Sequence, residues 1–355
     1  MFGVYFGRRP ALWLACLVCC AAVALQMGCS SRAGLYVGRL LLGFSNGFFV
    51  VFSTVYCSEA APAHLREIMV GLFSVYVNLG SIIGAIVDNY TNHHLNKLSY
   101  RIPLASMFIV PCILCVSLFF VPESPRWLLH HDQPDAARNA LEKLRSDHGE
   151  QLQLEWAEMQ RGVGEEQRMA QSTQAMDMFK GSDLRRTLLC YATIASQSAS
   201  GSWFLISYQT YFLSLAGITQ AFEYAILITC IGFAGVQVGL FSMKKLCGRR
   251  TILMLGALSC GLCELACGIA ASSVSSSSVP GSKATTGNVL LAFTTLFLFC
   301  YNAGVGVATS PLATELVSSR LRASTVGSAN ALGYFLAWLV GFCTPYFINP
   351  RDLNW

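Results

Sequence analysis

The chain has 355 residues, of which 54% are hydrophobic and 12% are charged, and its mean hydropathy is +0.50. The charged share is about half the quarter that is usual in soluble proteins. One water-soluble core cannot bury this much apolar surface, so lipid must cover part of it. The net charge is +5, but acids outnumber bases by eleven to nine in the charge-rich stretch 126–186. The composition predicts an all-α membrane protein with many spans, and it argues against a nucleic-acid-binding or disordered protein.

Apolar runs of the length that a bilayer requires, about 17–25 residues, recur along the chain. Nine candidate spans lie at 11–29, 35–56, 68–87, 102–121, 188–214, 222–243, 251–271, 288–313 and 324–347. The first run lacks an Ala-x-Ala-like cleavage site, so we interpret it as a membrane helix and not as a signal peptide. Almost all of the fifteen cysteines lie in apolar runs. This favours packing over metal binding, and no metal site is expected.

The loops between these spans carry Lys and Arg unequally. With the N-terminus in the cytoplasm, eighteen bases fall inside and five outside, as the positive-inside rule requires. This orientation puts 126–186 in the cytoplasm and the glycosylation sequon at Asn89 outside. Within 126–186, Pro134 stands at a helix start and small apolar residues follow at helical spacing. The predicted organisation is an N-terminal bundle over 1–125, a helical linker over 126–186, and a C-terminal bundle over 187–355.

Two charged motifs occur once in each half of the chain. They are Gly7-Arg8-Arg9 and Gly248-Arg249-Arg250, each before a span, and Glu59…Arg66 and Glu315…Arg322, each after a span. Duplicated motifs around a central charged segment indicate two homologous halves. A Glu and an Arg at neighbouring helix ends can form a charge-assisted pair across the halves, and such pairs would close the inner face.

The sequence Pro122-Glu123-Ser124-Pro125-Arg126-Trp127-Leu128 ends the fourth span. Together with the duplicated motifs, it resembles the signature of sugar porters of the major facilitator superfamily. The stretches 99–104, 208–212 and 344–350 are similar to fungal α-glucoside and lactose-type permeases. The resemblance covers essentially the whole chain. It implies twelve helices in two six-helix bundles, with the substrate held between the bundles and exposed to either side in turn.

In the family pattern, the nine spans correspond to helices three to eleven. Helix one, nearly all of helix two, and helix twelve have no counterpart in the chain. The family carries an acidic residue three places before Gly-Arg-Arg, whereas this chain has Val4 and Lys245 there. Both departures remove an acid from the expected gate. An incomplete gene model and a degenerate copy would each explain them, and the sequence leaves both open.

The resemblance also implies residues that contact the substrate. The Gln-Gln-x-x-Gly motif of family helix seven corresponds to 197–201, where Gln197 is kept and the second Gln is Ser198. An amide both donates and accepts hydrogen bonds. We therefore prefer ligand contact for Gln197 over a helix–helix hydrogen bond. For four further candidates, contact with the substrate and packing between helices are equally favoured. They are Ser74, Asn78, Asn302 and Trp203.

Two charged residues lie inside predicted spans, where ionisable groups are costly. Arg39 corresponds to the helix-four Arg that, in proton-coupled relatives, pairs with an Asp on helix one, so it is the candidate for proton coupling. Glu264 has no counterpart in the family pattern. Binding of a proton, contact with a neighbour and a tolerated defect are all open for it.

The expected gate lies at the cytoplasmic ends of the spans. Its residues are Arg8, Arg9, Glu59, Arg66, Glu123, Arg126, Arg249, Arg250, Glu315 and Arg322. A single hydrated ion pair contributes only about 0.2–1 kcal/mol. Several pairs acting together can shift a two-state equilibrium about a hundredfold.

The sequence thus predicts transport of a sugar, either an α-glucoside or a hexose, by alternating access, with proton coupling left open. The alternatives are a nutrient sensor that does not transport and a truncated, inactive relic. No enzymatic activity, cofactor, nucleic acid or obligate protein partner is expected. The expected partners are the sugar, protons if transport is coupled, and the lipid bilayer, with the plasma membrane as location.

Overall fold

The computed structural model describes most of the chain, and all regular elements in the described residues are helices. The described ranges are 2–29, 31–62, 65–93, 96–145, 149–171, 175–215, 218, 220–246, 248–275, 282–318 and 320–348. The chain forms two compact units, Met1–Phe73 with Val87–Gln171, and Ser74–Ile86 with Ser172–Trp355. Helix α4 (Arg66–Asn92) contributes residues to both units. The domain boundaries near 125 and 186 stay a prediction.

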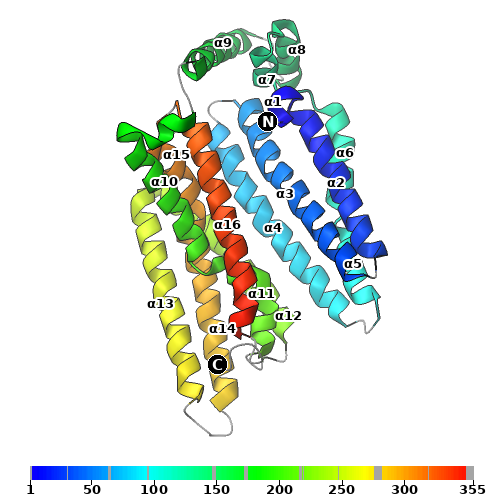
Figure 1. The fold of residues 1–355 in the computed structure, drawn as a ribbon, viewed down its shortest axis with the longest axis vertical. Coiled ribbons are helices and arrows are strands. Elements are labelled where there is room, and N and C mark those ends of the chain that lie inside the picture. The colour runs from blue at the N-terminus through cyan, green and yellow to red at the C-terminus, as the bar shows by residue number, and fades with distance from the viewer. Residues whose placement is uncertain are drawn as a thin grey trace. The chain divides into compact units, whose positions relative to one another are not determined.

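The first unit consists of long helices and a group of shorter ones (Figure 1). Besides its part of α4, its helices are α1 (Phe2–Tyr5), α2 (Arg8–Gly28), α3 (Arg32–Ala60), α5 (Leu98–Ser106), α6 (Ile109–Phe120), α7 (Pro125–His130), α8 (Pro134–Leu144) and α9 (Glu150–Gln171). Local sequence explains several helix starts. The Ser31 hydroxyl accepts from Gly34 N at 3.2 Å to cap α3, and Ser124 caps α7, where Pro125 takes the first position.

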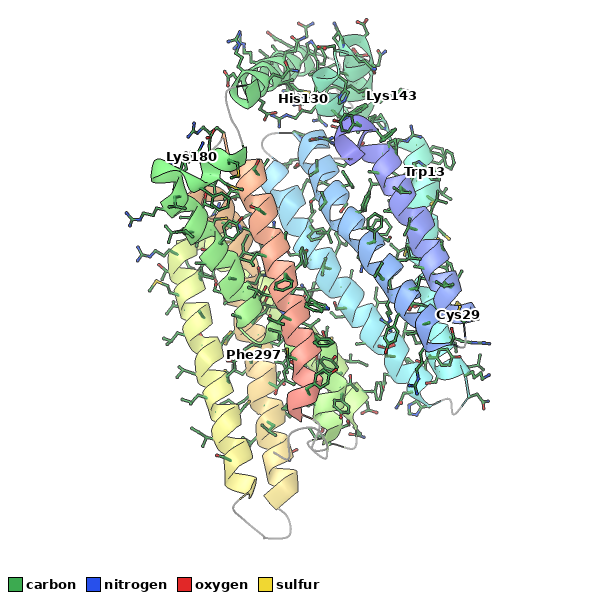
Figure 2. All side chains as sticks on the ribbon, viewed as in Figure 1. Trp13, Cys29, His130, Lys143, Lys180 and Phe297 are labelled. Atoms are coloured by element: carbon green, nitrogen blue, oxygen red, sulfur yellow. The ribbon has the colours of Figure 1, made fainter. Side chains whose placement is uncertain are left out.

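Small residues bring α2 close to α3 in the first unit. Ala15 and Ala22 are buried, and the Ser45 hydroxyl of α3 donates to the Ala15 carbonyl at 2.7 Å. Such contacts between small residues allow helices to approach closely in lipid. On another face of α2, Trp13 meets Phe119 of α6 edge-on, with ring centroids 4.6 Å apart (Figure 2). These contacts hold α2 between its two neighbours.

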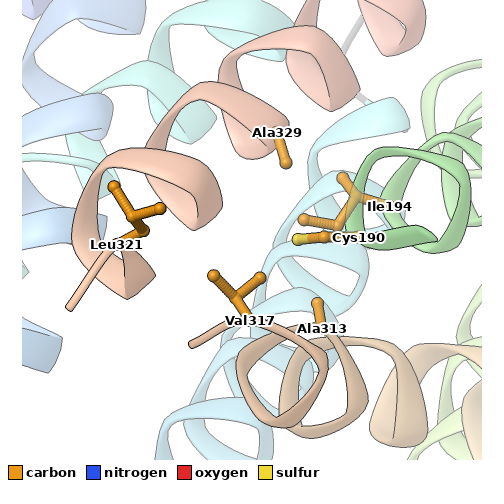
Figure 3. Packing of buried hydrophobic residues seen from close by; sticks show 6 residues of the cluster. All are labelled: Cys190, Ile194, Ala313, Val317, Leu321 and Ala329. Carbon is orange, nitrogen blue, oxygen red and sulfur yellow. The ribbon is translucent and has the colours of Figure 1, made fainter. Parts of the chain in front are cut away.

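The second unit is a bundle of long helices with two irregular segments. Besides its part of α4, its elements are η1 (Ala175–Phe179), α10 (Gly181–Ala199), α11 (Ser202–Leu215), α12 (Ala221–Lys245), α13 (Arg249–Ser275), α14 (Ser282–Tyr301), the π-helix η2 (Asn302–Gly306), α15 (Val307–Leu316) and α16 (Arg322–Ile348). A buried cluster joins α10 to α15 and α16 (Figure 3). Its residues are Cys190, Ile194, Ala313, Val317, Leu321 and Ala329.

Eight helical segments among the described residues are long and apolar enough to span a membrane. They are Arg8–Gly28, Arg32–Ala60, Gly71–Asn92, Leu98–Phe120, Ala221–Lys245, Arg249–Ala270, Gly287–Leu316 and Arg322–Thr344. The ninth expected span, 188–214, is divided into α10 and α11 at Gly201, whose φ of +75° interrupts the helix. A residue with a side chain rarely adopts this conformation, which explains why glycine stands there.

Candidate functional site

The first duplicated motif forms a charged cluster at the start of α2. We call Arg8, Arg9, Glu59, Glu123 and Ser124 the first charged cluster. Arg8 holds Glu59 with two hydrogen bonds, Nη2 to Oε1 at 2.9 Å and Nε to Oε2 at 3.2 Å. The two side chains are only 15% and 11% exposed, so little water screens their attraction. The Ser124 hydroxyl donates to the same Glu59 carboxylate at 2.6 Å.

Glu123 and Arg9 bind helix ends of opposite polarity within this cluster. The Glu123 carboxylate accepts from the backbone N–H groups of Arg8 at 3.0 Å and Arg9 at 3.1 Å, in the first turn of α2. The Arg9 guanidinium donates to the carbonyls of Leu118 at 2.7 Å and Phe119 at 3.4 Å, near the end of α6. An acid at a helix start and a base at a helix end both interact favourably with the helix dipole. The cluster thus fixes the loop between α6 and α7 against α2.

Arg126 lies beside this cluster but pairs with a different helix. Its Nη2 donates to Glu166 of α9 at 2.8 Å, and His130 Nε2 lies 3.3 Å from the same carboxylate. Arg126 and Glu59 line one cavity of about 160 Å³. Arg126 therefore lies near Glu59, and its role in a gate stays a prediction. His130 ends α7, and Lys143 lies in the last turn of α8 (Figure 2).

The second duplicated motif forms the equivalent pair in the second unit. Arg249, at the start of α13, bonds Glu315, near the end of α15. Arg249 and Glu315 occupy the same motif positions as Arg8 and Glu59. Arg250 and Arg322 are exposed, and the described residues form no ion pair with them. Pairing across the halves stays a prediction, as does a role for Arg66, whose side chain lies outside the described residues.

Asp183 and Arg320 form an ion pair that the sequence did not predict. Arg320 Nη2 donates to Asp183 Oδ2 at 2.6 Å, and this joins the start of α10 to the loop between α15 and α16. The hydrogen bond from Arg320 lowers the pKa of Asp183 below its ordinary value. The signal in the sequence was an acid at the first turn of a helix, which is common and did not specify a partner.

The predicted substrate residues of family helix seven lie where the span is divided. We call Gln197, Ser202 and Tyr301, together with Gly201, the helix-break cluster. The side chains of Gln197 and Ser202 lie near the Tyr301 hydroxyl. Tyr301 is 6% exposed, at the end of α14. Tyr301 and Ser202 were not predicted from the sequence, because neither residue type is distinctive within an apolar run.

Ser198 makes a hydrogen bond between helices. Its hydroxyl donates to the Gly333 carbonyl of α16 at 2.8 Å, and Ser198 is 4% exposed. Asn302 begins η2, and its amide nitrogen lies 2.8 Å from the position that a Cβ on Gly232 would take. Trp203 is half-buried in the first turn of α11. The contacts of Ser198 match a packing role, and ligand contact by any of these three residues remains a prediction.

The two candidates on α4 interact locally. Asn78 Nδ2 donates to the Ser74 carbonyl at 2.9 Å, within the same helix, and both residues are half-buried. Among the residues that the structure describes, no hydrogen bond joins either one to Gln197. Arg39 is exposed on α3 and has no ion pair with the described residues. Roles for these three residues in substrate or proton binding remain predictions.

Lys245 stands at one position where the sugar porters have an acid. Its ammonium group lies 5.4 Å from the ring centroid of Phe241, one turn earlier on α12. This is a cation–π contact. The side chain of Val4, at the equivalent position of the first half, lies outside the described residues.

Comparisons with known proteins agree with this arrangement. Residues 1–351 match the sequence model of the family described as "Sugar (and other) transporter". The chain is 28% identical to a major facilitator-type transporter of Aspergillus rugulosus, and the match covers 99% of the chain and 66% of the relative. It is 30% identical to the general alpha-glucoside permease of Saccharomyces cerevisiae, and this match covers 99% of the chain and 57% of the permease. The chain thus spans less than two thirds of the length of these relatives.

Solved structures of similar fold belong to the major facilitator superfamily. The proton:xylose symporter XylE superposes with a TM-score of 0.77 at 18% identity, covering 98% of this chain and 74% of the symporter. An inward-open form of XylE from E. coli gives a TM-score of 0.74. With the family match over 1–351, the chain belongs to the sugar (and other) transporter family and has the major facilitator fold.

Proposed function

We propose that the protein carries a sugar across a membrane by alternating access, and that its substrate is an α-glucoside or a hexose. The helix-break cluster supports this most strongly. It places an amide and two hydroxyl groups at the interruption of a helical run in a chain of this family. These groups donate and accept hydrogen bonds, as a polyhydroxyl ligand requires. The named substrates of the yeast alpha-glucoside permease and of XylE fall in the same chemical class.

Transport of this kind requires no covalent chemistry. The sugar has only to bind the inward-open and outward-open states with different contacts, since a ligand shifts an equilibrium by its differential affinity. In the proposal, Gln197 exchanges its contact with Tyr301 for one with a sugar hydroxyl. The Arg8–Glu59 pair joins the start of α2 to the end of α3, and the Arg249–Glu315 pair joins the start of α13 to the end of α15. In the proposal, these pairs rearrange when the transporter changes state.

The proposed orientation puts the start of α2 and the segment 126–186 in the cytoplasm of a cell whose plasma membrane holds the protein. The supporting observation is the excess of Lys and Arg on that side. Asn89 then faces outward. Glycosylation at Asn89 that is lost in Asn89→Gln supports this orientation. Labelling of Lys143 in intact cells by an impermeant amine reagent contradicts it.

Uptake of radiolabelled maltose and glucose, by yeast that lacks its own sugar transporters, tests the proposed function. We expect uptake of at least one sugar, and Gln197→Ala should raise the half-saturation concentration about 3- to 10-fold, the cost of one or two lost hydrogen bonds. Gln237→Ala is the matched control, since Gln237 is an exposed amide on α12. Equal effects of the two substitutions would remove Gln197 from the site.

The sensor and relic alternatives give different results in the same cells. A sensor binds maltose without accumulating it, and a relic neither binds nor accumulates it. Binding is measured on the purified protein by calorimetry, alongside uptake. Saturable binding together with uptake above vector-only cells supports the transporter over both alternatives.

A further inference from the structure

Glu264 lies against the break between α10 and α11. A Cβ built on Gly201 would stand only 2.5 Å from the Glu264 Oε1 atom. The φ of +75° favours glycine at position 201, and the absence of a Cβ lets the Glu264 carboxylate approach the break. Glu264 belongs to the membrane-length segment Arg249–Ala270 of α13. An acid of this segment thus reaches the point at which a neighbouring helical run is interrupted.

The first turn of α11 offers a favourable place for a negative charge. Gly201 directly precedes α11, and the first backbone N–H groups of a helix have no partner within that helix. The same end carries the positive pole of the helix dipole. Discontinuous membrane helices use such ends to hold charged groups. A Glu264 carboxylate beside Gly201 is stabilised in this way only while the break keeps its present geometry.

The other groups that face Glu264 supply no compensating positive charge. From its own helix these are Cys260, Cys263 and Cys267. Thiols are ordinarily neutral at pH 7. On the other packed elements, α12 and α15, the described charged residues are Glu223, Lys244, Lys245 and Glu315, all near helix ends. An acid inside a span with no basic side chain beside it is a candidate for binding a proton.

The helix-break cluster connects this acid to the proposed sugar site. Gln197 lies one turn before Gly201 on the interrupted run, and Ser202 directly follows Gly201. Both side chains approach the Tyr301 hydroxyl. Any movement of the break that separates Glu264 from α11 also shifts these side chains. The geometry therefore links the charge of Glu264 to the orientation of Gln197.

We propose that Glu264 is a proton-binding site at the α10–α11 break, and that its protonation is coupled to sugar binding at Gln197. The second part rests on the proposed function, whereas the first does not. As a carboxylate, Glu264 anchors the break through the α11 N-terminus. When Glu264 takes up a proton, the anchor is released, so Gln197 can leave Tyr301 and bind sugar. Sugar affinity then falls as the pH rises.

The proton site is tested without any sugar. Dicyclohexylcarbodiimide reacts with protonated carboxyl groups in apolar surroundings, and mass spectrometry of the purified protein in lipid nanodiscs identifies the labelled residue. We expect labelling of Glu264 that decreases as the pH is raised from about 5 to 8, a range in which ordinary carboxyls stay ionised. Glu223, exposed in the first turn of α12, is the internal comparison. Labelling of Glu264 no stronger than that of Glu223 would overturn the proposal.

The coupling is tested by calorimetric titration with maltose at pH 5.5 and 7.5. We expect the Kd of the unmodified protein to rise about 10-fold between these pH values, within the range usual for coupled sites. Glu264→Gln should keep the tighter value at both pH values, and Glu223→Gln should behave as the unmodified protein. A pH dependence that survives in Glu264→Gln refutes the coupling. Absence of maltose binding in every variant contradicts the proposed function instead, and the labelling result for Glu264 stands separately.

Discussion

Gly7 shows how one residue position sets the geometry of the first charged cluster. It directly precedes α2 with a φ of +101°, in the region that side chains disfavour. A Cβ on Gly7 would stand 2.6 Å from Glu123 Oε2. Glycine is therefore required both by the backbone and by the carboxylate that caps α2.

Gly7→Ala should destabilise the protein by about 1–3 kcal/mol, the usual cost of a strained backbone residue. Chemical unfolding in detergent, followed by the far-UV signal, measures the change. Gly43→Ala in α3 is the control, because nothing lies within 4 Å of its added Cβ. In a helix this control should be neutral or stabilising by up to about 1 kcal/mol. Equal stability of Gly7→Ala and Gly43→Ala would contradict the account of Gly7.

Asp183 and Arg320 predict a pH dependence of stability. The folded pKa of Asp183 is below its ordinary value of 3.8 because Arg320 donates to its carboxylate. The pair therefore contributes stability above pH 3.8, and the contribution is lost as the pH falls through the lower folded pKa. Asp183→Asn should lower the melting temperature at pH 7, and the difference from the unmodified protein should shrink below pH 3.8. The double substitution Asp183→Asn with Arg320→Gln should cost less than the sum of the two single ones. A difference in melting temperature between Asp183→Asn and the unmodified protein that is constant with pH would contradict the predicted pH dependence.

At the scale of the elements, glycines let α13 approach η2. A Cβ on Gly304 would stand 2.5 Å from the Gly256 Cα atom, and one on Gly256 would stand 2.7 Å from the Gly304 Cα atom. Such backbone contacts are typical of helices packed in lipid, where small residues lie at the interface. Both neighbours are backbone atoms, so a rotamer change cannot relieve the clash.

Gly304→Ala should therefore destabilise the second unit by about 1–3 kcal/mol, as overpacking usually does. Thermal unfolding of the purified protein in detergent measures it. Gly261→Ala, on the same helix as Gly256 but with open space around its Cβ, is the control. If Gly304→Ala is as stable as Gly261→Ala, η2 is not held by this contact.

The helices were predicted from the sequence more fully than their interruptions. Apolar runs and their lengths predicted eight of the nine spans, because burial in lipid imposes the same composition on each. The break at Gly201 lies against Glu264, and the π-helix at Asn302 lies against Gly232 and Gly256, all from other helices. A single sequence does not contain those contacts. The duplicated motifs indicated that Arg8 and Glu59 belong to one charged region, but the expected pairs were across the halves, and Arg8–Glu59 lies within the first unit. The Asp183–Arg320 pair has no repeat, and the sequence did not indicate it.

For the whole molecule, we expect a weaker inner gate, because Val4 and Lys245 stand where the family pattern has acids. Val4→Asp with Lys245→Glu should strengthen the closure of the inner face by adding anions beside the Arg8 and Arg249 motifs. The measurement is the rate at which a cytoplasmic thiol reagent labels Gln197→Cys in the proposed sugar site, which should fall about 3- to 10-fold if the gain is about 1 kcal/mol. Leu17→Asp, also acidic but in the middle of α2, is the control and should give no such protection. An unchanged rate in the restored double variant would mean that the two departures are tolerated surface changes.

Counterflow across a liposome membrane tests whether the protein transports sugar by alternating access. Purified protein is reconstituted into liposomes loaded with unlabelled maltose, and trace radiolabelled maltose is added outside without a pH gradient. The account predicts transient accumulation of label above equilibrium, reduced in Gln197→Ala and retained in Gln237→Ala. Entry of label no faster than into protein-free liposomes, for both maltose and glucose, would contradict it.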